Sequence, residues 1–444
     1  MNSAIPRSLR ASILLACLSA GASGPALAAN GALIDLLGLL RDKGTLTAAE
    51  YDMLVAAAQA DQAGAAAGTA AATSAAGAAT VANATPGATT AALGVATTAP
   101  VATGTATAAE VKTVAERLDR LAWLEKVRIK GDLRTRYEYK DDEGQLARSR
   151  GRFRYRLGVI ANPVDRVEVG AGLASGTRDQ RSTNQSFDDT FSGKDLNLDY
   201  AYMQYSAANG VRAIAGKFSF KNYLWTPTDI MWDTDLNPEG VSLAWGTQNA
   251  LGPMFVQGGV WVLEENGGSS DDPYMVYGQV GQGWTMGGWK GTAAVAAYGF
   301  ADANFVTDFS RHDGRNTDSK LSSVNLALDL SHPLGGGTFD FIGEYIKNIE
   351  TNTATDTAWA LGAKYALGRW SAKYVYADVE LNAVPDFLPD SDRDNGFTGE
   401  RGHEFEISYE LMKNVAVALD YYHIKDEVTR RDEDLLQADL NVKF

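Results

Sequence analysis

The stretch "VRIKGDLRTRYEYK", Val127 to Lys140, decides the fold class of this chain. Every second residue, starting from Val127, belongs to a mainly apolar series, and every residue between them is charged. Because successive side chains of a strand point to opposite faces, this alternation predicts a β-strand with one apolar face and one charged face. A strand of this kind separates an apolar environment from an aqueous one.

The same pattern continues from residue 127 to the last residue, 444, where we count sixteen candidate strands bounded by turn residues. Short connections (162–165, 332–337, 368 and 412–414) alternate with long ones (about 179–195, 219–239, 301–320 and 379–401). An even strand number with short and long connections in alternation is typical of bacterial outer-membrane barrels. We therefore predict an all-β, 16-stranded antiparallel transmembrane β-barrel over 127–444, with its apolar face toward lipid and its charged face toward an aqueous lumen.

Residues 1–28 predict a secretory signal peptide, with a basic start, an apolar centre and the small-residue cleavage site "ALA". Cys17 is the only cysteine and lies inside this segment, so the exported chain would have no disulfide. An alternative, a lipoprotein signal ending in "LLAC" at Cys17, leaves only about six apolar residues before the cut, fewer than such signals use.

Three segments precede the predicted barrel. Residues 29–61 form a predicted helical hairpin, in which "TAAE" (47–50) has the spacing of a capping box. Residues 62–109 carry no charge and are mainly Ala, Thr and Gly, which predicts a flexible linker. Residues 110–126 predict a short helix, and its apolar spacing fits equally a coiled coil or one amphipathic helix.

Composition excludes several classes of function. The net charge of −15 over 444 residues argues against a nucleic-acid partner. No run of about 18 apolar residues is present, so the sequence predicts no transmembrane helix. The chain has no P-loop and no GxSxG motif, and nothing in it calls for a cofactor.

The C-terminus adds a resemblance. Leu440, Val442 and Phe444 lie at alternate positions and resemble the assembly signal of outer-membrane barrels. Together with "LIDLLGLLRDKGTLTAAEYDML" (33–54) and "WDTDLNPEG" (232–240), they make the chain similar to the Gram-negative putative porin family. The resemblance implies a homotrimeric porin in the cell outer membrane, in contact with lipid and lipopolysaccharide and assembled by the barrel-assembly machinery, with its N-terminal segment in the periplasm. It implies a passive channel that catalyses no reaction.

A basic ladder is the most specific feature of the predicted lumen. Its members share the charged face of the first two strands and are Arg128, Lys130, Arg134, Arg136, Arg152, Arg154 and Arg156. On the lipid face each would cost about 2–4 kcal/mol at mid-bilayer, so we expect them to line the pore. The alternative is that they only pair with acidic neighbours in a plugged barrel.

The third external loop by hairpin count, residues 219–239, supplies the opposite charge. In porins that the chain resembles, this loop folds into the channel, and here it carries Asp229, Asp233, Asp235 and Glu239. Acidic groups facing a basic wall would set up a transverse field, and charged rings are how pores select ions. The alternative is that these acids only decorate an external loop.

Other candidate sites are weaker. "DSDRDNG" (390–396) resembles a calcium loop, but its glycine comes one place late and Arg401 stands where the loop needs Glu, so we expect a solvated loop. His403 and His423 fall on the apolar face near the external rim without a serine nucleophile. His312 and His332 lie apart, in a loop and a turn, so no metal site is expected.

Three hypotheses about function remain. The first is a passive diffusion porin for small hydrophilic solutes and ions, with the basic wall facing the acidic constriction loop. The second is a substrate-selective channel for an anionic solute. The third is a closed barrel that acts as an adhesin or as an outer-membrane enzyme.

Overall fold

The computed structural model describes residues 41, 51–52, 55–56 and 126–444, apart from 178, 266, 269–271 and 302–313. The chain divides into two units, residues 1–103 and 104–444. The predicted signal peptide, the linker and all but the last residue of the predicted helix 110–126 lie outside the described residues. Of the predicted hairpin, five residues are described, and all are helical: Arg41, Tyr51, Asp52, Val55 and Ala56. No helix of the described residues is long and apolar enough to cross a membrane.

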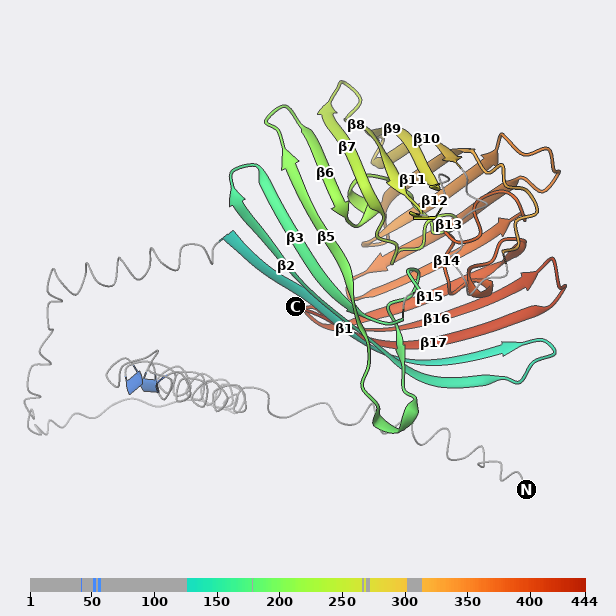
Figure 1. Ribbon diagram of the computed structural model, residues 1–444, viewed down its shortest axis with the longest axis horizontal. Helices are drawn as coiled ribbons and strands as arrows, with labels where there is room; N and C mark the ends of the chain where they lie inside the picture. The colour runs from blue at the N-terminus through green and yellow to red at the C-terminus, as the bar shows by residue number, and fades with distance from the viewer. Residues whose placement is uncertain are drawn as a thin grey trace, which may run out of the picture. The chain divides into compact units, whose positions relative to one another are not determined.

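The second unit contains a closed antiparallel β-barrel (Figure 1). In the described part of the chain its sixteen strands are β1 (Val127–Asp142), β2 (Arg148–Val164), β3 (Val167–Ser175), β5 (Leu196–Ser206), β6 (Val211–Lys217), β7 (Glu239–Gln248), β8 (Pro253–Val262), β9 (Tyr274–Met286), β10 (Trp289–Ala301), β11 (Ser323–Leu334), β12 (Gly337–Asn348), β13 (Thr357–Leu367), β14 (Trp370–Val379), β15 (Glu400–Met412), β16 (Val415–Asp426) and β17 (Asp432–Lys443). The two-residue β4 (Gln185–Ser186) pairs only with β2, and the short 3-10 helices are η2 (Asp189–Phe191), η3 (Phe220–Asn222) and η5 (Asp394–Gly396). The strand number predicted from the sequence is confirmed.

The first and last strands close the barrel. β1 pairs with β17 from Asp132↔Lys443 to Asp142↔Glu433, and Figure 1 shows the two side by side. The backbone of Phe444 continues the ladder, because its N–H donates to the Gly131 carbonyl at 3.0 Å and its carbonyl accepts from Gly131 N–H at 2.8 Å. The Phe444 ring occupies the space that a side chain at position 131 would need. It also stacks on the Tyr155 ring, with ring centroids 6.5 Å apart.

The two faces of the strands differ as the alternation predicts. On β1, Ile129 is 66% exposed and Leu133 is 40% exposed on the outer face, whereas Arg136 and Glu138 are buried on the inner face. A closed sheet leaves no unpaired edge, so an apolar exterior can meet hydrocarbon without exposing backbone polar groups. The barrel therefore has the exterior of a membrane-spanning protein.

Several long connections turn into the barrel and fill much of it. Segment A comprises residues 218–238, between β6 and β7, and segment B comprises residues 380–399, between β14 and β15. They are joined by backbone hydrogen bonds from Asp233 N–H to Leu388 and from Asp390 N–H to Asp229. Arg181, from the connection between β3 and β5, donates to carbonyls of segment B, and so the three connections pack together.

The prediction of a solvated loop at 390–396 is wrong. Asp394 and Arg393 are buried in the barrel, because segment B enters the lumen behind its own apolar residues Ala383, Val384, Phe387 and Leu388. The aspartates of this stretch therefore face other protein groups more than water.

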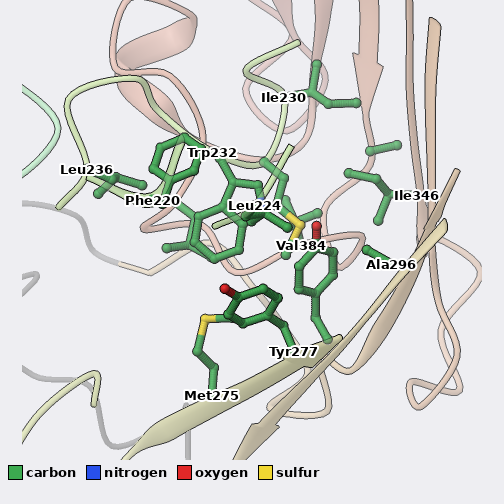
Figure 2. Close-up of a cluster of buried hydrophobic side chains, with 14 of the residues drawn as sticks. Phe220, Leu224, Ile230, Trp232, Leu236, Met275, Tyr277, Ala296, Ile346 and Val384 are labelled. Carbon is green, nitrogen blue, oxygen red and sulfur yellow. The ribbon is translucent and has the colours of Figure 1, made fainter. Parts of the chain in front are cut away.

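An apolar cluster attaches segment A to the inner wall on one side of the lumen (Figure 2). Trp232 lies at its centre, with ring centroids 5.4 Å from Trp261, 5.7 Å from Tyr298 and 5.8 Å from Phe220. The wall residues come from the inner faces of β6 to β10 and of β12 to β14. Since apolar area removed from water stabilises by about 25 cal/mol per Å², this cluster fixes segment A inside the barrel.

Closure of the barrel gives a first prediction. A Cβ atom at Gly131 would lie 2.4 Å from the Arg156 carbonyl oxygen and 2.5 Å from the Phe444 ring. We expect Gly131→Val to lower the thermal unfolding temperature of the purified barrel, with overpacking costing about 1–3 kcal/mol. Gly278→Val is the control, because nothing lies within 4 Å of a Cβ at Gly278. Equal unfolding temperatures for the two variants would contradict the predicted closure.

Candidate functional site

The basic ladder lies on the inner face of β1 and β2. Arg134 is directly opposite Arg154, and Arg136 is directly opposite Arg152. Like charges in such cross-strand pairs repel, so this arrangement needs acidic partners. Arg128 and Lys130 continue the same face toward the start of β1, where Arg128 pairs with Glu168 at 2.6 Å and Lys130 lies 5.5 Å above the Tyr200 ring.

Acidic partners reach every arginine of the ladder. Arg156 and Arg154 share Asp132 at 2.6 and 3.0 Å, and Arg156 also reaches Asp235 of segment A at 3.2 Å. The remaining pairs are Arg136 with Asp439 at 2.7 Å and with Asp392 at 3.2 Å, Arg134 with Asp439 at 3.6 Å, and Arg152 with Glu138 at 3.1 Å. The positive wall is therefore compensated locally.

Two of these partners stand in the opening stretch itself. Asp132 and Glu138 flank Arg134 and Arg136 on the same face of β1, and they were not among the predicted site residues. Their period-2 spacing was the signal that could have identified them.

Three of the four acids predicted for the constriction loop lie in segment A and enter the lumen. Asp235 meets the arginine wall, Asp233 is buried against segment B and accepts from Ser391 N–H at 2.9 Å, and Asp229 borders a cavity described below. The prediction that Glu239 belongs to the constriction loop is wrong. It is the first residue of β7, its side chain is 66% exposed, and it pairs with Lys217 at 3.1 Å. It shares the outward parity of Val241 and Leu243, so it does not face the arginine wall.

Burial and neighbouring charges shift the pKa values of the acids in segments A and B in different directions. Burial, with Asp235 nearby, raises the pKa of Asp233 well above its usual range. Burial, with Asp229 and Asp392 nearby, does the same to the pKa of Asp390. Burial would also raise the pKa of Asp235, but Arg154 and Arg156 outweigh it and hold that pKa below its usual range.

These shifts predict a pH dependence. A carboxyl group whose folded pKa is raised stabilises the fold below its unfolded pKa of about 4, and this contribution is lost as pH rises through the folded pKa. The junction of segments A and B should therefore be tighter at pH 5 than at pH 9, with a quieter and smaller ion current at pH 5. Asp390→Asn should reduce this difference, whereas the exposed Asp188→Asn should keep it. An unchanged difference in Asp390→Asn would argue against the junction as its source.

Two cavities lie on either side of Lys221 and Thr234, which line both. The first, of about 340 Å³, is bounded by segment A and the inner faces of β12 to β15. The second, of about 390 Å³, is bounded by segment A and the ladder side, including Lys130, Arg156 and Lys443. Both linings include charged side chains, and the two cavities share Lys221 and Thr234.

Sequence reasoning missed the lysines of this route. Neither Lys221 of segment A nor Lys364 of β13 has an ion-pair partner within 4 Å among the described residues. Lys221 lies on a segment for which the sequence predicted only acidic site residues. Lys364 stands alone in a strand whose inner face is otherwise Ala and Gly, and that isolated charge was the available signal.

The remaining candidates lie away from the lumen. Leu440 and Phe444 are exposed on the outer face of the closing strand, where Val442 shares their parity.

The four histidines lie apart from the lumen or outside the described residues. His403 forms a hydrogen bond with Tyr374 at 2.9 Å, and His423 lies 2.9 Å from Asp434 on the same outer surface. His332 stacks on Trp289, and His312 lies outside the described residues. Within the ranges that the structure describes, no group of three His, Cys, Asp or Glu could hold a metal ion.

Comparison with known proteins agrees with this architecture. Residues 142–324 match the family model described as putative porin. The resemblance to that family is confirmed. The solved structures that match include Pseudomonas putida OprB at high pH, with 12% identity, a TM-score of 0.51, and coverage of 73% of this chain and 96% of that one. A triple mutant of Rhodopseudomonas blastica porin has 12% identity and a TM-score of 0.42, over 72% of this chain and all of that one. No curated protein matches the sequence.

Proposed function

We propose that this protein is an outer-membrane porin, a passive channel for small hydrophilic solutes and ions. The observation that carries the proposal is the closed barrel with an apolar exterior and a charged interior, which contains two cavities that share Lys221 and Thr234. A transmembrane barrel of this size encloses a lumen, and lining charges set which solutes pass. Segments A and B narrow that lumen, so only small solutes should cross.

The family match and the fold support this proposal without assigning a solute. Residues 142–324 match the putative porin model, and the barrel fold is that of solved porins. The proposal includes location in the outer membrane with the N-terminal segment in the periplasm, contact with lipid and lipopolysaccharide, assembly by the barrel-assembly machinery and a homotrimeric state. It includes no chemical reaction.

Swelling of liposomes that contain the purified chain tests the proposal. Glycine, glycerol, arabinose and sucrose give a series of increasing size, and we expect swelling with the smallest solutes and a steep loss along the series. Liposomes without protein and liposomes with heat-denatured protein are the controls. No swelling with glycine, although the barrel is inserted and protected from protease, would favour the closed-barrel adhesin or enzyme.

The arginine ladder gives a prediction on selectivity. Replacing Arg152, Arg154 and Arg156 with Gln leaves Glu138, Asp132 and Asp235 without these partners. The lining then becomes more negative, so the reversal potential under a salt gradient should move toward cation preference. The change should shrink in 1 M salt, where the Debye length is about 3 Å against about 10 Å at 0.1 M.

A matched variant separates this effect from a general loss of charge. Arg369→Gln removes an arginine from the short turn between β13 and β14, outside the ladder, and should leave the reversal potential unchanged. A triple mutant with the reversal potential of the parent in dilute salt would place the ladder outside the conducting route.

A further inference from the structure

The cavity of about 340 Å³ between segment A and the wall of β12 to β15 combines two kinds of lining. One side is apolar and belongs to the lumenal cluster, with Phe220, Leu224 and Val375. The other side carries ammonium groups. Its volume lies within the range of about 300–1,000 Å³ that small-molecule sites occupy.

Three lysines and two acids line this cavity, which leaves a formal charge of 3 − 2 = +1. Lys373 is committed to acids, because it pairs with Glu404 and lies 3.4 Å from Glu406. It also interacts with the second acid of the lining, Asp229. Lys221 and Lys364 remain as the cations without an ion pair among the described residues.

The two lysines approach the cavity from different elements. Lys221 belongs to segment A, and Lys364 to β13 of the barrel wall. Burial lowers the pKa of Lys221, with Asp235 and Asp233 opposing this effect. Asp329 of β11 also interacts with Lys364, but it lies beyond ion-pair distance and outside the lining. Asp340 of β12 stands opposite Lys364 in the strand register, also without an ion pair to it. A guest with a negative group would thus find two ammonium groups that form no ion pair with a carboxylate of the described residues.

We propose that this cavity is a binding site for a small organic anion that joins one carboxylate to an apolar ring. The carboxylate would lie between Lys221 and Lys364, and the ring would lie against Leu224, Trp225 and Val375. A purely polar anion would leave the apolar wall in contact with water, and an uncharged ring would leave the ammonium groups without a partner. The chemistry therefore selects molecules that have both parts.

The position of the cavity gives the site a role in transport. Because Lys221 and Thr234 also line the second cavity, an anion released from the first meets Lys130, Arg156 and Lys443 next. This inference rests on the proposed channel function and names its substrate class.

Block of the potassium chloride current by benzoate tests the site in the full-length protein, in planar bilayers at 0.1 M salt. Benzamide has the same ring without the charge, and acetate has the charge without the ring. We expect benzoate to interrupt the current at lower concentration than either. Equal block by benzamide, equal block by acetate, or no block by benzoate would each overturn the proposal.

Variants separate the site from the rest of the lumen. Lys364→Gln and Lys221→Gln should each raise the half-blocking benzoate concentration about tenfold, as expected for loss of one charged hydrogen bond, without changing the effect of benzamide. Lys413→Gln, in the turn between β15 and β16, is the matched control and should behave as the parent. A shift in Lys413→Gln equal to that in Lys364→Gln would also overturn the proposal.

Failure of the channel function gives a different result from failure of the site. A folded, inserted barrel without any potassium chloride current contradicts the proposed function. Equilibrium dialysis of labelled benzoate against the same protein in detergent then decides the site. Binding that Lys364→Gln weakens supports it, and no binding overturns it.

Discussion

Trp232→Ala should release segment A from the barrel wall and increase both the size and the noise of the single-channel current. Trp232 is buried against Phe220, Trp261 and Tyr298. Removing a buried Trp side chain costs about 3–5 kcal/mol. That energy corresponds to more than about a hundredfold change in the population of the packed segment, since 1.4 kcal/mol is tenfold.

The measurement is single-channel recording of parent and variant at the same voltage and salt concentration. Trp370→Ala is the control, because Trp370 is 55% exposed on the outer face and contacts Tyr409 there. It should leave the current unchanged. A quiet current of parental size in Trp232→Ala would mean that segment A does not restrict the route.

Arg393→Gln should cause a large loss of stability. Arg393 and Glu400 are both only 2% exposed, and they form a two-point pair with nitrogen–oxygen distances of 3.1 and 3.2 Å. Breaking a buried pair costs about 3–5 kcal/mol, because the remaining charge stays buried without a partner. Urea unfolding of the purified protein, followed by tryptophan fluorescence, should show the loss as a lower midpoint.

Two further variants define the cause. Arg401→Gln removes an exposed pair with Glu427, whose side chains are 44% and 41% exposed, and should cost about 0–1 kcal/mol. The double variant Arg393→Met with Glu400→Leu should recover much of the stability, because no unpaired charge is left. If Arg393→Gln and Arg401→Gln had the same midpoint, segment B would not depend on its buried pair.

The strands and the direction of their faces could be predicted from the sequence because each outer face meets lipid. Leu133, Thr135 and Tyr137 alternate with Arg134 and Arg136 because one face of the strand meets lipid and the other meets the lumen. This pattern can be recognised in the sequence without knowledge of the tertiary contacts. The inward course of segment A was expected only through the family resemblance.

The interior was harder to predict because protein, and not only water, covers part of it. Strands β9 and β10 are mainly apolar on both faces. Tyr298 points inward against Trp232, and Tyr277 points inward against Trp261. Apolar residues on both faces are the pattern of a sheet covered on both sides, and in a barrel this indicates a plug. Segment B was missed because its aspartates suggested an external loop, while its preceding "AVPDFL" (383–388) carried the apolar signal for burial.

The charge pairing of the lumen could not be predicted from single residues. Asp439 of β17 and Asp392 of segment B both meet Arg136, although they are far apart in the chain. Such pairs form only when the first and last strands close the barrel and segment B enters the lumen. Because of these pairs, the arginine wall is a compensated surface and not a free positive one. In the lining of the first cavity, Lys221 and Lys364 are the lysines without an ion pair among the described residues.

Conductance of the purified full-length protein in a planar bilayer tests the central claim most directly. The account predicts discrete, steady current steps that scale with the salt concentration and become larger and noisier in Trp232→Ala. A folded protein that enters the bilayer and leaves the current at its baseline would contradict the claim that this barrel is a channel.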